Sequence, residues 1–441
     1  MPRRRKSGRL HVFLNGRLVG QLNKKASGAI DFRYDTTWLV WEHTMPVSLS
    51  LPLREDRYIG APVLAVFDNL LPDNASIRQK LAEHVGADGT DAFNLLAALG
   101  RDCVGALQFL PDDKEPGRTG TIKGHPIDND TISDLLNNLT HSPLGVGHDD
   151  DFRISIAGAQ EKTALLRYRG RWQKPIGTTP TTHILKPQIG KLPNGIDLSN
   201  SVENEYLCLT ITKAMDLPSA TVEMTTFGEK RVLIVERFDR LLTNDKRLLR
   251  VPQEDCCQAL SVPWTRKYEN EGGPGVRQIL RLLAGSDEAS SDRKHFLKAL
   301  IAFWLLGATD GHAKNFSIFL SPGGGFHMTP LYDIVSAQPS LDAKQIRHNQ
   351  MKLAMAVGDK RHYAIESISG RHFVQSAEKA GMGREIALDV LDDVLKNGEF
   401  ALQRALDRMP AKFPEAITDS IAKGFRSRLG QLDQERLPRN H

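Results

Sequence analysis

The sequence predicts an α+β fold with two lobes, because its hydrophobic patterns change character along the chain. Short strand-like runs dominate the first 240 residues, whereas helical periodicity dominates from about residue 250 onward. The sequence contains no internal repeat. Strands followed by helices are typical of α+β proteins, so we expect a β-rich first part and an all-helical C-terminal lobe.

The first predicted element is a β-hairpin. Strand-like runs at 10–14 and 17–22 flank the pair Asn15-Gly16, which is a strong hairpin-turn signal. Residues 111–126 are rich in Pro, Gly and charge, which predicts a loop. We place the end of a β-rich first domain, 1–141, shortly after it. Its other expected elements are strands at 32–34, 38–40, 48–53 and 104–110 and helices at 77–85, 92–99 and 131–139.

Two further domains are expected. Residues 142–240 alternate strand patterns at 163–167, 182–186 and 231–236 with one helical pattern at 202–215. Residues 241–441 carry mainly helical periodicity, which predicts helices at 275–284, 292–306, 372–380, 384–396, 398–408 and 412–429.

Composition narrows the class of protein without identifying a partner. The chain has 441 residues, 40% apolar residues and a net charge of +5, which are ordinary values for a globular protein. Four cysteines without a Cys-x-x-Cys pair favour a reducing compartment and no structural zinc. A signal-peptide pattern and an 18-residue apolar run are both absent from the sequence, so we expect a cytoplasmic protein.

The most informative stretch is 307–319, in which a compact turn lies between a helix-like apolar run at 297–306 and a strand-like run at 316–320. It places Asp310 and Asn315 in the Asp-x-x-x-x-Asn spacing of protein-kinase catalytic loops. There the Asp orients the attacking hydroxyl and the Asn holds Mg²⁺. With His312 between them, the turn also resembles the phosphoinositide-kinase loop. The alternative is an ordinary helix end at Gly311, with Asp and Asn as turn formers.

Two earlier segments carry groups that could bind phosphate. Residues 155–162 form a small-residue turn before a strand, and such a turn lets backbone N–H groups approach phosphate oxygens. Lys186 ends the following strand, where a kinase lysine contacts the α- and β-phosphates and is steadied by a helix Glu. Glu203 and Glu205 lie on the next helix, and we prefer Glu205. The alternatives are a plain turn and a solvated lysine.

Two further segments complete the set. Residues 235–238 lie where strands give way to helices, as a hinge between lobes would, although Phe238 could equally be a core residue. Asp333 lies downstream of Asp310, after a Gly-rich turn and a short strand, where kinases carry a second Mg²⁺-binding Asp. An Asp at a strand end is also an ordinary feature. The order of all these segments, however, is that of a kinase.

With these residues together, the chain resembles the HipA family of serine/threonine kinase toxins over nearly its whole length. Four segments carry the resemblance: FDNLLPD at 67–73, DFRISIAGAQEKT at 151–163, VERFD at 235–239 and GATDGHAKN at 307–315.

The resemblance implies a two-lobed protein-kinase-like fold and a role for each site residue. Asp310 would be the catalytic base, Asn315 and Asp333 would hold Mg²⁺, and Lys186 would contact the phosphates of ATP. Ser155 matches the family's autophosphorylated serine. The other nucleotide-binding residues implied are Ala157, Gly158, Ala159, Gln160, Glu161, Lys162, Glu236, Arg237, Phe238, His312, Ala313, Lys314 and Tyr332.

The resemblance also implies partners: ATP and Mg²⁺ as cofactors, a helix-turn-helix antitoxin, operator DNA bound mainly through that antitoxin, and glutamyl-tRNA synthetase as substrate. The family's direct DNA contacts would fall near 376–382, where only Lys379 is basic, so we do not carry that contact over to this chain. Two other functions stay open. One is a small-molecule kinase of the aminoglycoside or phosphoinositide type. The other is a catalytically silent corepressor, which would not need Asp310.

Overall fold

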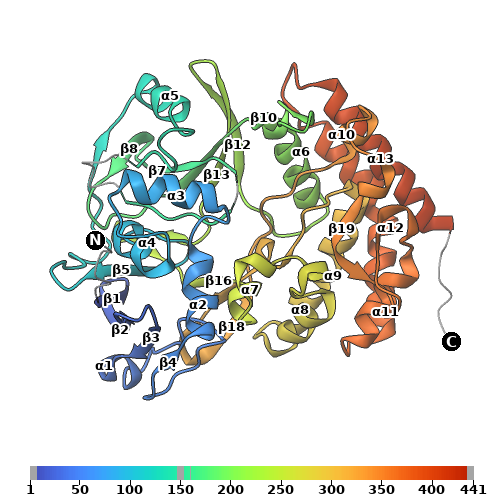
Figure 1. Cartoon of the computed structure of the whole chain (residues 1–441). Helices are drawn as coiled ribbons and strands as arrows, with labels where there is room; N and C mark the ends of the chain where they lie inside the picture. The colour runs from blue at the N-terminus through green and yellow to red at the C-terminus, as the bar shows by residue number, and fades with distance from the viewer. Residues whose placement is uncertain (1–6, 147–152, 159, 435–441) are drawn as a thin grey trace. The chain divides into compact units, whose positions relative to one another are not determined.

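The computed structural model describes residues 7–146, 153–158 and 160–434, which form two compact units (Figure 1). The first unit comprises Met1–Pro187, Thr225–Thr265 and Ile318–Gly325. The second comprises Gln188–Met224, Arg266–Ser317 and Phe326–His441. Each unit therefore combines segments that are far apart in the sequence.

A five-stranded antiparallel sheet opens the first unit. The predicted hairpin is confirmed, because Leu14 pairs with Arg17 and both turn residues have positive φ, 46° at Asn15 and 81° at Gly16. Two left-handed residues in succession match the right-handed twist of the strands they join. The strand order is β4 (Tyr58–Ile59), β3 (Ile30–Tyr34), β2 (Arg17–Lys24), β1 (Gly8–Leu14) and β5 (Leu107–Pro111).

The strands predicted at 38–40 and 48–53 are wrong. Trp38 lies in the short helix α1 (Thr36–Leu39), where its buried indole donates to the carbonyl of Met45 at 2.9 Å. In the described structure residues 48–53 form bends rather than a strand. The hydroxyl of Ser50 donates to the carbonyl of Gln258 at 2.7 Å. Hydrogen bonds from side chains to the backbone thus replace those of a strand ladder. A period-two pattern in the sequence does not reveal this difference.

The remaining helices of this part are α2 (Ala61–Phe67), the 3-10 turn η1 (Asp68–Leu70), α3 (Ala75–His84) and α4 (Ala92–Leu99). The predicted helices at 77–85 and 92–99 are confirmed as α3 and α4. Each has an N-cap side chain, Asn74 or Asp91, that accepts a backbone N–H of the first turn. Such caps satisfy donors that the helix itself leaves unpaired.

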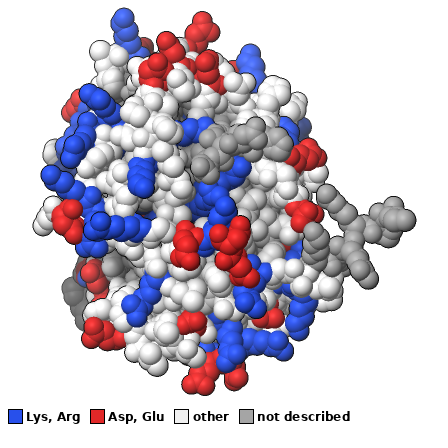
Figure 2. All heavy atoms as spheres, turned by 90° about the vertical axis from the view of Figure 1, so that its left-hand side faces the viewer, with Lys and Arg blue, Asp and Glu red and all other residues white. Residues whose placement is uncertain are grey.

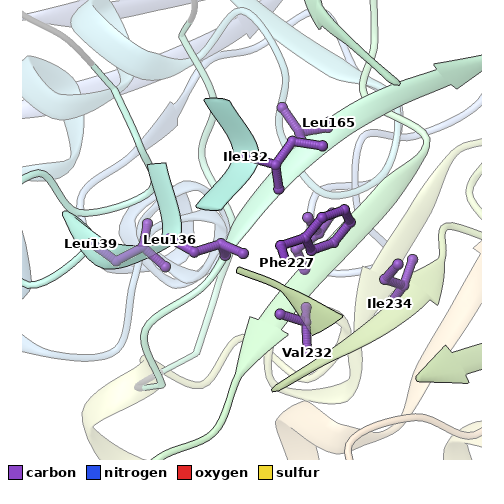
Figure 3. Packing of buried hydrophobic residues seen from close by; sticks show 8 residues of the cluster. Ile132, Leu136, Leu139, Leu165, Phe227, Val232 and Ile234 are labelled. Atoms are coloured by element: carbon purple, nitrogen blue, oxygen red, sulfur yellow. The ribbon is translucent and has the colours of Figure 1, made fainter. Parts of the chain in front are cut away.

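A six-stranded sheet carries the predicted lysine. Its strand order is β12 (Val222–Phe227), β13 (Lys230–Glu236), β9 (His183–Pro187), β7 (Thr163–Tyr168), β8 (Arg171–Pro175) and β6 (Gly124–Pro126). Helix α5 (Asn129–Asn137) packs on it, and Ile132 and Leu136 join a cluster with Leu185 (Figure 3). Because strand side chains alternate, Lys186 projects from the sheet face opposite this cluster.

The first unit also contains β14 (Arg240–Leu242), β15 (Leu248–Arg250), β16 (Gln253–Asp255) and helix α7 (Cys256–Ala259). β17 (Ser317–Leu320) follows the turn that begins at Gly307 and carries Asp310, His312 and Asn315, called the catalytic turn below for its expected role, and its position is as the sequence predicts. The face shown in Figure 2 mixes Lys and Arg with Asp and Glu. Across the described ranges, no helix combines the length and apolar character that a membrane span needs.

The expectation of an all-helical C-terminal lobe is wrong, because the second unit mixes strands with helices. Its strands are β10 (Gly190–Lys191), β11 (Asp197–Leu198), β18 (Phe326–Met328), β19 (Lys352–Val357) and β20 (His362–Ala364). Most are two or three residues long, too short for a periodic pattern. β19 is longer but buried at all positions except Lys352, so it shows no alternation.

The helices of the second unit are α6 (Ser201–Ala214), α8 (Val276–Leu282), α9 (Ala289–Leu306), α10 (Gln338–Asp342), α11 (Gly370–Lys379), α12 (Arg384–Leu406) and α13 (Glu415–Gln434). The two helices expected at 384–396 and 398–408 form one continuous helix, α12. Gly398 lies at their expected junction, and a Cβ there would come within 3.2 Å of Leu429 on α13. The glycine therefore permits close helix packing and does not end the helix.

Candidate active site

The catalytic turn begins where α9 ends. Gly307 adopts a left-handed conformation with φ 66° and caps the helix, as glycine commonly does. The N–H of Ala308 then donates to the carbonyl of Phe303 at 2.8 Å. The expected order of helix, turn and strand is confirmed, but Gly307 rather than Gly311 ends the helix.

Gly311 has a different reason to be glycine. A Cβ at this position would lie 2.4 Å from Cδ2 of Phe303. That ring is stacked on Phe316, with centroids 5.5 Å apart, and Phe296 meets Phe316 edge-on at 4.9 Å. The turn thus rests on a buried aromatic base that leaves no room for a side chain at 311.

Backbone hydrogen bonds hold Asp310 inside this turn. Its carbonyl accepts the N–H of His312 at 2.8 Å and Nδ2 of Asn315 at 2.8 Å. His312 and Asn315 are buried, whereas Asp310 is exposed. The turn therefore presents the Asp310 carboxylate at its surface, while the backbone that carries it is fixed.

Asn315 has the chemistry of a magnesium ligand. Because its Nδ2 is engaged as a donor, Oδ1 is the atom left as a ligand, and Mg²⁺ prefers hard oxygens. The described residues contain no group of three or more His, Cys, Asp or Glu side chains placed to hold a metal. Kinase sites use few protein ligands and complete the shell with phosphates, so Asn315 and Asp333 fit that arrangement.

Asp333 is tied to the same turn through its neighbour. The hydroxyl of Tyr332 donates to the carbonyl of Lys314 at 2.8 Å and lies 2.5 Å from Oγ of Ser317. On its other side, Leu331 forms a bridge with Ser219. The second unit therefore brings Asp310, His312, Lys314, Asn315 and Tyr332 together, with Asp333 next in sequence to Tyr332.

One residue of this site has no counterpart among the sequence motifs. The hydroxyl of Tyr268 donates to Oδ1 of Asp310 at 2.5 Å, and its ring meets the His312 ring edge-on with centroids 4.9 Å apart. Tyr268 precedes Asp310 by 42 residues and belongs to no recognisable pattern. Only the folded chain identifies it.

The predicted phosphate loop belongs to the first unit and docks on the segment after α2. Ser155 is fully buried, and its hydroxyl donates to the carbonyl of Leu70 at 2.7 Å. Gly158 forms a parallel bridge with Pro72, and Nζ of Lys162 donates to the carbonyl of Ala157 at 3.0 Å. Residues 67–73 thus serve as the seat of this loop, a role that their sequence alone does not suggest.

The rest of the loop is placed as follows. Nε2 of Gln160 donates to the carbonyl of Pro187 at 3.2 Å, and Glu161 is exposed, with its carboxylate accepting the hydroxyl of Thr140 at 3.3 Å. Ala159 lies outside the described residues. Gly158 has φ 110°, a conformation open to glycine, and leaves room for the ammonium group of Lys162.

The hinge segment, 235–238, alternates buried and less buried side chains, with Val235 and Arg237 buried. Glu236 is exposed at the end of β13, and Phe238 is half-buried and meets Phe319 edge-on at 5.7 Å. The guanidinium of Arg237 is buried and pairs with Asp239 at 2.8 Å and Asp102 at 3.4 Å. The Arg237 side chain is therefore committed to an internal ion network.

That network fixes the base of the hinge. Burial alone would raise the pKa of Asp102, but Arg240, Arg250 and Arg237 together hold it well below its ordinary value. The carboxylate is therefore charged, and its partners compensate the cost of burying it. The backbone carbonyl of Asp102 also accepts the N–H of Ser155 at 2.9 Å, which joins the hinge to the phosphate loop.

Lys186 is buried on β9 in the first unit, and Glu203 and Glu205 are buried on α6 in the second. Because the lysine and the glutamates belong to different units, their pairing stays a prediction.

Comparison with known proteins identifies the family. A model described as "HipA-like C-terminal domain" matches residues 154–401, and one described as "HipA N-terminal domain" matches residues 10–110. The chain belongs to the HipA family. One relative is the Sinorhizobium fredii protein Y4mE, whose name contains the word kinase. It is 35% identical over 404 residues, which cover 90% of this chain and 92% of that protein.

A second relative is the serine/threonine-protein kinase toxin HipA of Shewanella oneidensis. It is 26% identical over 417 residues, covering 91% of this chain and 90% of that protein. The solved complex of Shewanella oneidensis HipA, HipB and operator DNA matches with a TM-score of 0.80 at 24% identity, covering 98% of this chain and 100% of that one. This match shows a mixed α+β, kinase-like fold. As a HipA family member the chain is a protein kinase, and a kinase uses ATP.

Proposed function

We propose that this chain transfers the γ-phosphoryl group of ATP to a serine or threonine hydroxyl of a protein. The observation that carries the proposal is the catalytic turn, in which His312 and Asn315 hold the backbone of Asp310 while its carboxylate stays exposed. Phosphoryl transfer depends mainly on such positioning and on electrostatic stabilisation.

In the proposed reaction Asp310 accepts the proton of the attacking hydroxyl. That oxygen forms a bond to the γ-phosphorus as the bond from phosphorus to the β-phosphate oxygen breaks, which leaves ADP and a phosphoprotein. Lys186 and the backbone of the phosphate loop bind the phosphates, and Asn315 and Asp333 would hold Mg²⁺. When bound, the cation neutralises charge that develops on the phosphate oxygens.

We infer further that the chain is the toxin of a toxin–antitoxin module. Support comes from the Shewanella oneidensis relative, which is named a toxin, and from its solved complex with HipB and operator DNA. A helix-turn-helix antitoxin would bind this chain, and operator DNA would be contacted mainly through that antitoxin. Glutamyl-tRNA synthetase is the protein substrate that the family resemblance favours.

Asp310→Asn tests the catalytic role. The variant should lose phosphotransfer by about 100-fold or more, because general-base help of this size is removed, while ATP affinity stays unchanged. Asp419→Asn, an exposed carboxylate on α13, is the matched control and should behave as wild type. The measurement is ³²P transfer from ATP to glutamyl-tRNA synthetase, with a nucleotide-binding titration alongside.

The same assay separates the alternatives. Activity of Asp310→Asn within about tenfold of wild type would remove Asp310 from the mechanism. Transfer to aminoglycosides or phosphoinositides but to no protein would favour a small-molecule kinase. The absence of ATP turnover in wild type would favour a silent corepressor.

A further inference from the structure

The contact between Tyr268 and Asp310 involves the same carboxylate that the proposed reaction needs as a base. Tyr268 Oη donates to Oδ1 of Asp310 at 2.5 Å. An exposed aspartate has broad freedom about its terminal torsion, and Asp310 is exposed. Hydrogen bonds to an ionised acceptor are short and stronger than neutral ones. This one therefore restricts which way the two carboxylate oxygens face.

The segment that carries Tyr268 is itself anchored within the second unit. The carbonyl of Lys267 accepts the N–H of Ala313 at 3.4 Å, which links the segment to the catalytic turn. Oε2 of Glu269 accepts the N–H of Ala356 on β19 at 2.6 Å, and Oε1 pairs with Arg361 at 3.2 Å. Tyr268 is thus held between the catalytic turn on one side and β19 on the other.

Two glycines show how tightly the segment turns after Tyr268. Gly272 is left-handed, with φ 89°, and the N–H of Gly273 donates to the carbonyl of Tyr268 at 2.9 Å. A Cβ at Gly273 would lie 2.1 Å from the carbonyl oxygen of Arg266. The backbone on both sides of Tyr268 is therefore fixed, and the hydroxyl is delivered to Asp310 by rigid structure.

We propose that Tyr268 is a positioning residue for Asp310, an inference that rests on the proposed role of Asp310 as the base. The hydrogen bond from the tyrosine hydroxyl to Oδ1 fixes the orientation in which the Asp310 carboxylate meets the acceptor hydroxyl of the protein substrate. It acts in the transition state through Asp310 and does not itself exchange a proton with the substrate. Because the carboxylate is already oriented, less conformational entropy is lost when the transition state forms.

The hydroxyl can be removed while the ring remains. Tyr268→Phe keeps the edge-on ring contact with His312 and deletes the bond to Asp310. We expect kcat to fall about tenfold or more, as the loss of a hydrogen bond to a charged group would cause, with the KM for ATP unchanged. The control is Tyr58→Phe in the first unit. It deletes a hydrogen bond of the same length, 2.5 Å, from the tyrosine hydroxyl to the carbonyl of Pro52.

The assay is steady-state transfer to glutamyl-tRNA synthetase, or Mg-ATP hydrolysis if that protein is not phosphorylated. A second measurement places Tyr268→Phe in the Asp310→Asn background. If the tyrosine acts through Asp310, the double variant should keep the residual rate of Asp310→Asn without further loss. A purely structural role would lower both backgrounds alike.

The outcomes separate the inference from the function beneath it. The inference is supported if Tyr268→Phe lowers kcat without changing the KM for ATP, and if the same substitution has no effect on the rate in the Asp310→Asn background. An unchanged kcat overturns it. A raised kcat or a lower KM for the protein substrate also overturns it, because the hydroxyl would then occupy the substrate's place. Activity of Asp310→Asn within about tenfold of wild type would instead overturn the proposed catalytic role, whatever the result for Tyr268→Phe.

Discussion

Asp333 holds a backbone conformation that residues other than glycine seldom adopt. Its φ is 59°, in the left-handed region that Asp and Asn tolerate better than other side chains. Uncommon backbone angles of this kind are often found at functional sites, where the surrounding structure enforces them. The bridge of Leu331 to Ser219 and the two contacts of the Tyr332 hydroxyl provide that enforcement just before Asp333.

Asp333→Asn separates charge from conformation, because Asn also accepts a left-handed backbone. We expect Mg²⁺-dependent ATP affinity to fall by about tenfold or more, since Mg²⁺ binds proteins mainly through carboxylates, while the free energy of unfolding stays within about 0.5 kcal/mol of wild type. Nucleotide titration with and without Mg²⁺ measures the first effect and urea unfolding the second. If the variant binds ATP as tightly as wild type both with and without Mg²⁺, Asp333 is a turn residue and not a magnesium ligand.

Glu254 gives the first unit a pH-dependent stability. Burial raises the pKa of this side chain to about 8, against an opposing bond from the N–H of Leu49 at 2.8 Å. Because the folded-state pKa lies above the ordinary value of 4.5, the folded protein binds the carboxyl proton of Glu254 more tightly than the unfolded chain does. The stabilisation is fully present below about pH 4.5 and is lost as the pH rises to about 8.

Glu254→Gln should therefore remove part of the pH dependence of unfolding. Between about pH 5 and 8 the unfolding free energy of the variant should gain on that of wild type by ~1.4 kcal/mol per pH unit at most. Urea unfolding at several pH values measures this, with the exposed Glu55→Gln as control. Parallel curves for wild type and Glu254→Gln would show that Glu254 ionises normally when folded.

At the scale of elements, the phosphate loop depends on the segment that receives it. Ser155 lies between Ile154 and Ile156, all three are buried, and the serine hydroxyl donates to a carbonyl oxygen. Once Ser155 is phosphorylated, its Oγ carries no proton and cannot donate to that carbonyl. The phosphate also adds about −1.5 to −2 charges. Burying such a charge against an acceptor is costly, so phosphorylation should undock the loop.

We predict that incubation with Mg-ATP phosphorylates Ser155 and that the product binds ATP poorly, because the undocked loop withdraws its backbone N–H groups. Intact mass, peptide mapping and a nucleotide titration measure this in turn. Ser155→Asp, with a single charge, should reproduce the effect in part, and Ser155→Ala should keep ATP binding without the mass increase. A phosphate mapped only to other residues, or normal ATP binding by the Ser155 phosphoprotein, would contradict the prediction.

The same seat explains the first of the four family segments. In residues 67–73 the carboxylate of Asp68 pairs with Arg78 at 2.5 Å and accepts the indole N–H of Trp264 at 2.8 Å. Arg78 in turn donates to the carbonyl of Pro72 at 2.6 Å. These bonds hold the segment in the shape on which Gly158 docks, so the segment supports the predicted phosphate loop.

At the scale of the molecule, the two units divide the proposed chemistry. The phosphate loop, Lys186 and the hinge belong to the first, and the catalytic turn, Tyr332, Asp333 and Tyr268 belong to the second. The division of the chain at residues 141 and 240 stays a prediction. The HipA models match on either side of the first boundary, at 10–110 and 154–401.

The features that the sequence predicts correctly depend on neighbouring residues. The hairpin follows from Asn15-Gly16, helices α3 and α4 from their apolar patterns, and the catalytic turn from the apolar runs on both sides of Asp310. These signals are local, because each depends on backbone preference or periodicity within a few residues. The order of the motifs along the chain then sufficed to indicate the HipA family.

The tertiary structure reveals the features that depend on residues far apart in the chain. It placed Tyr268 on Asp310, seated the phosphate loop on residues 67–73 and committed the Arg237 side chain to an ion network with Asp102. It also placed Trp38 and Leu39 of the predicted strand at 38–40 in helix α1, where the Trp38 indole is buried. Contacts of this kind leave no periodic trace in a sequence, because the partners meet only after the intervening chain has folded.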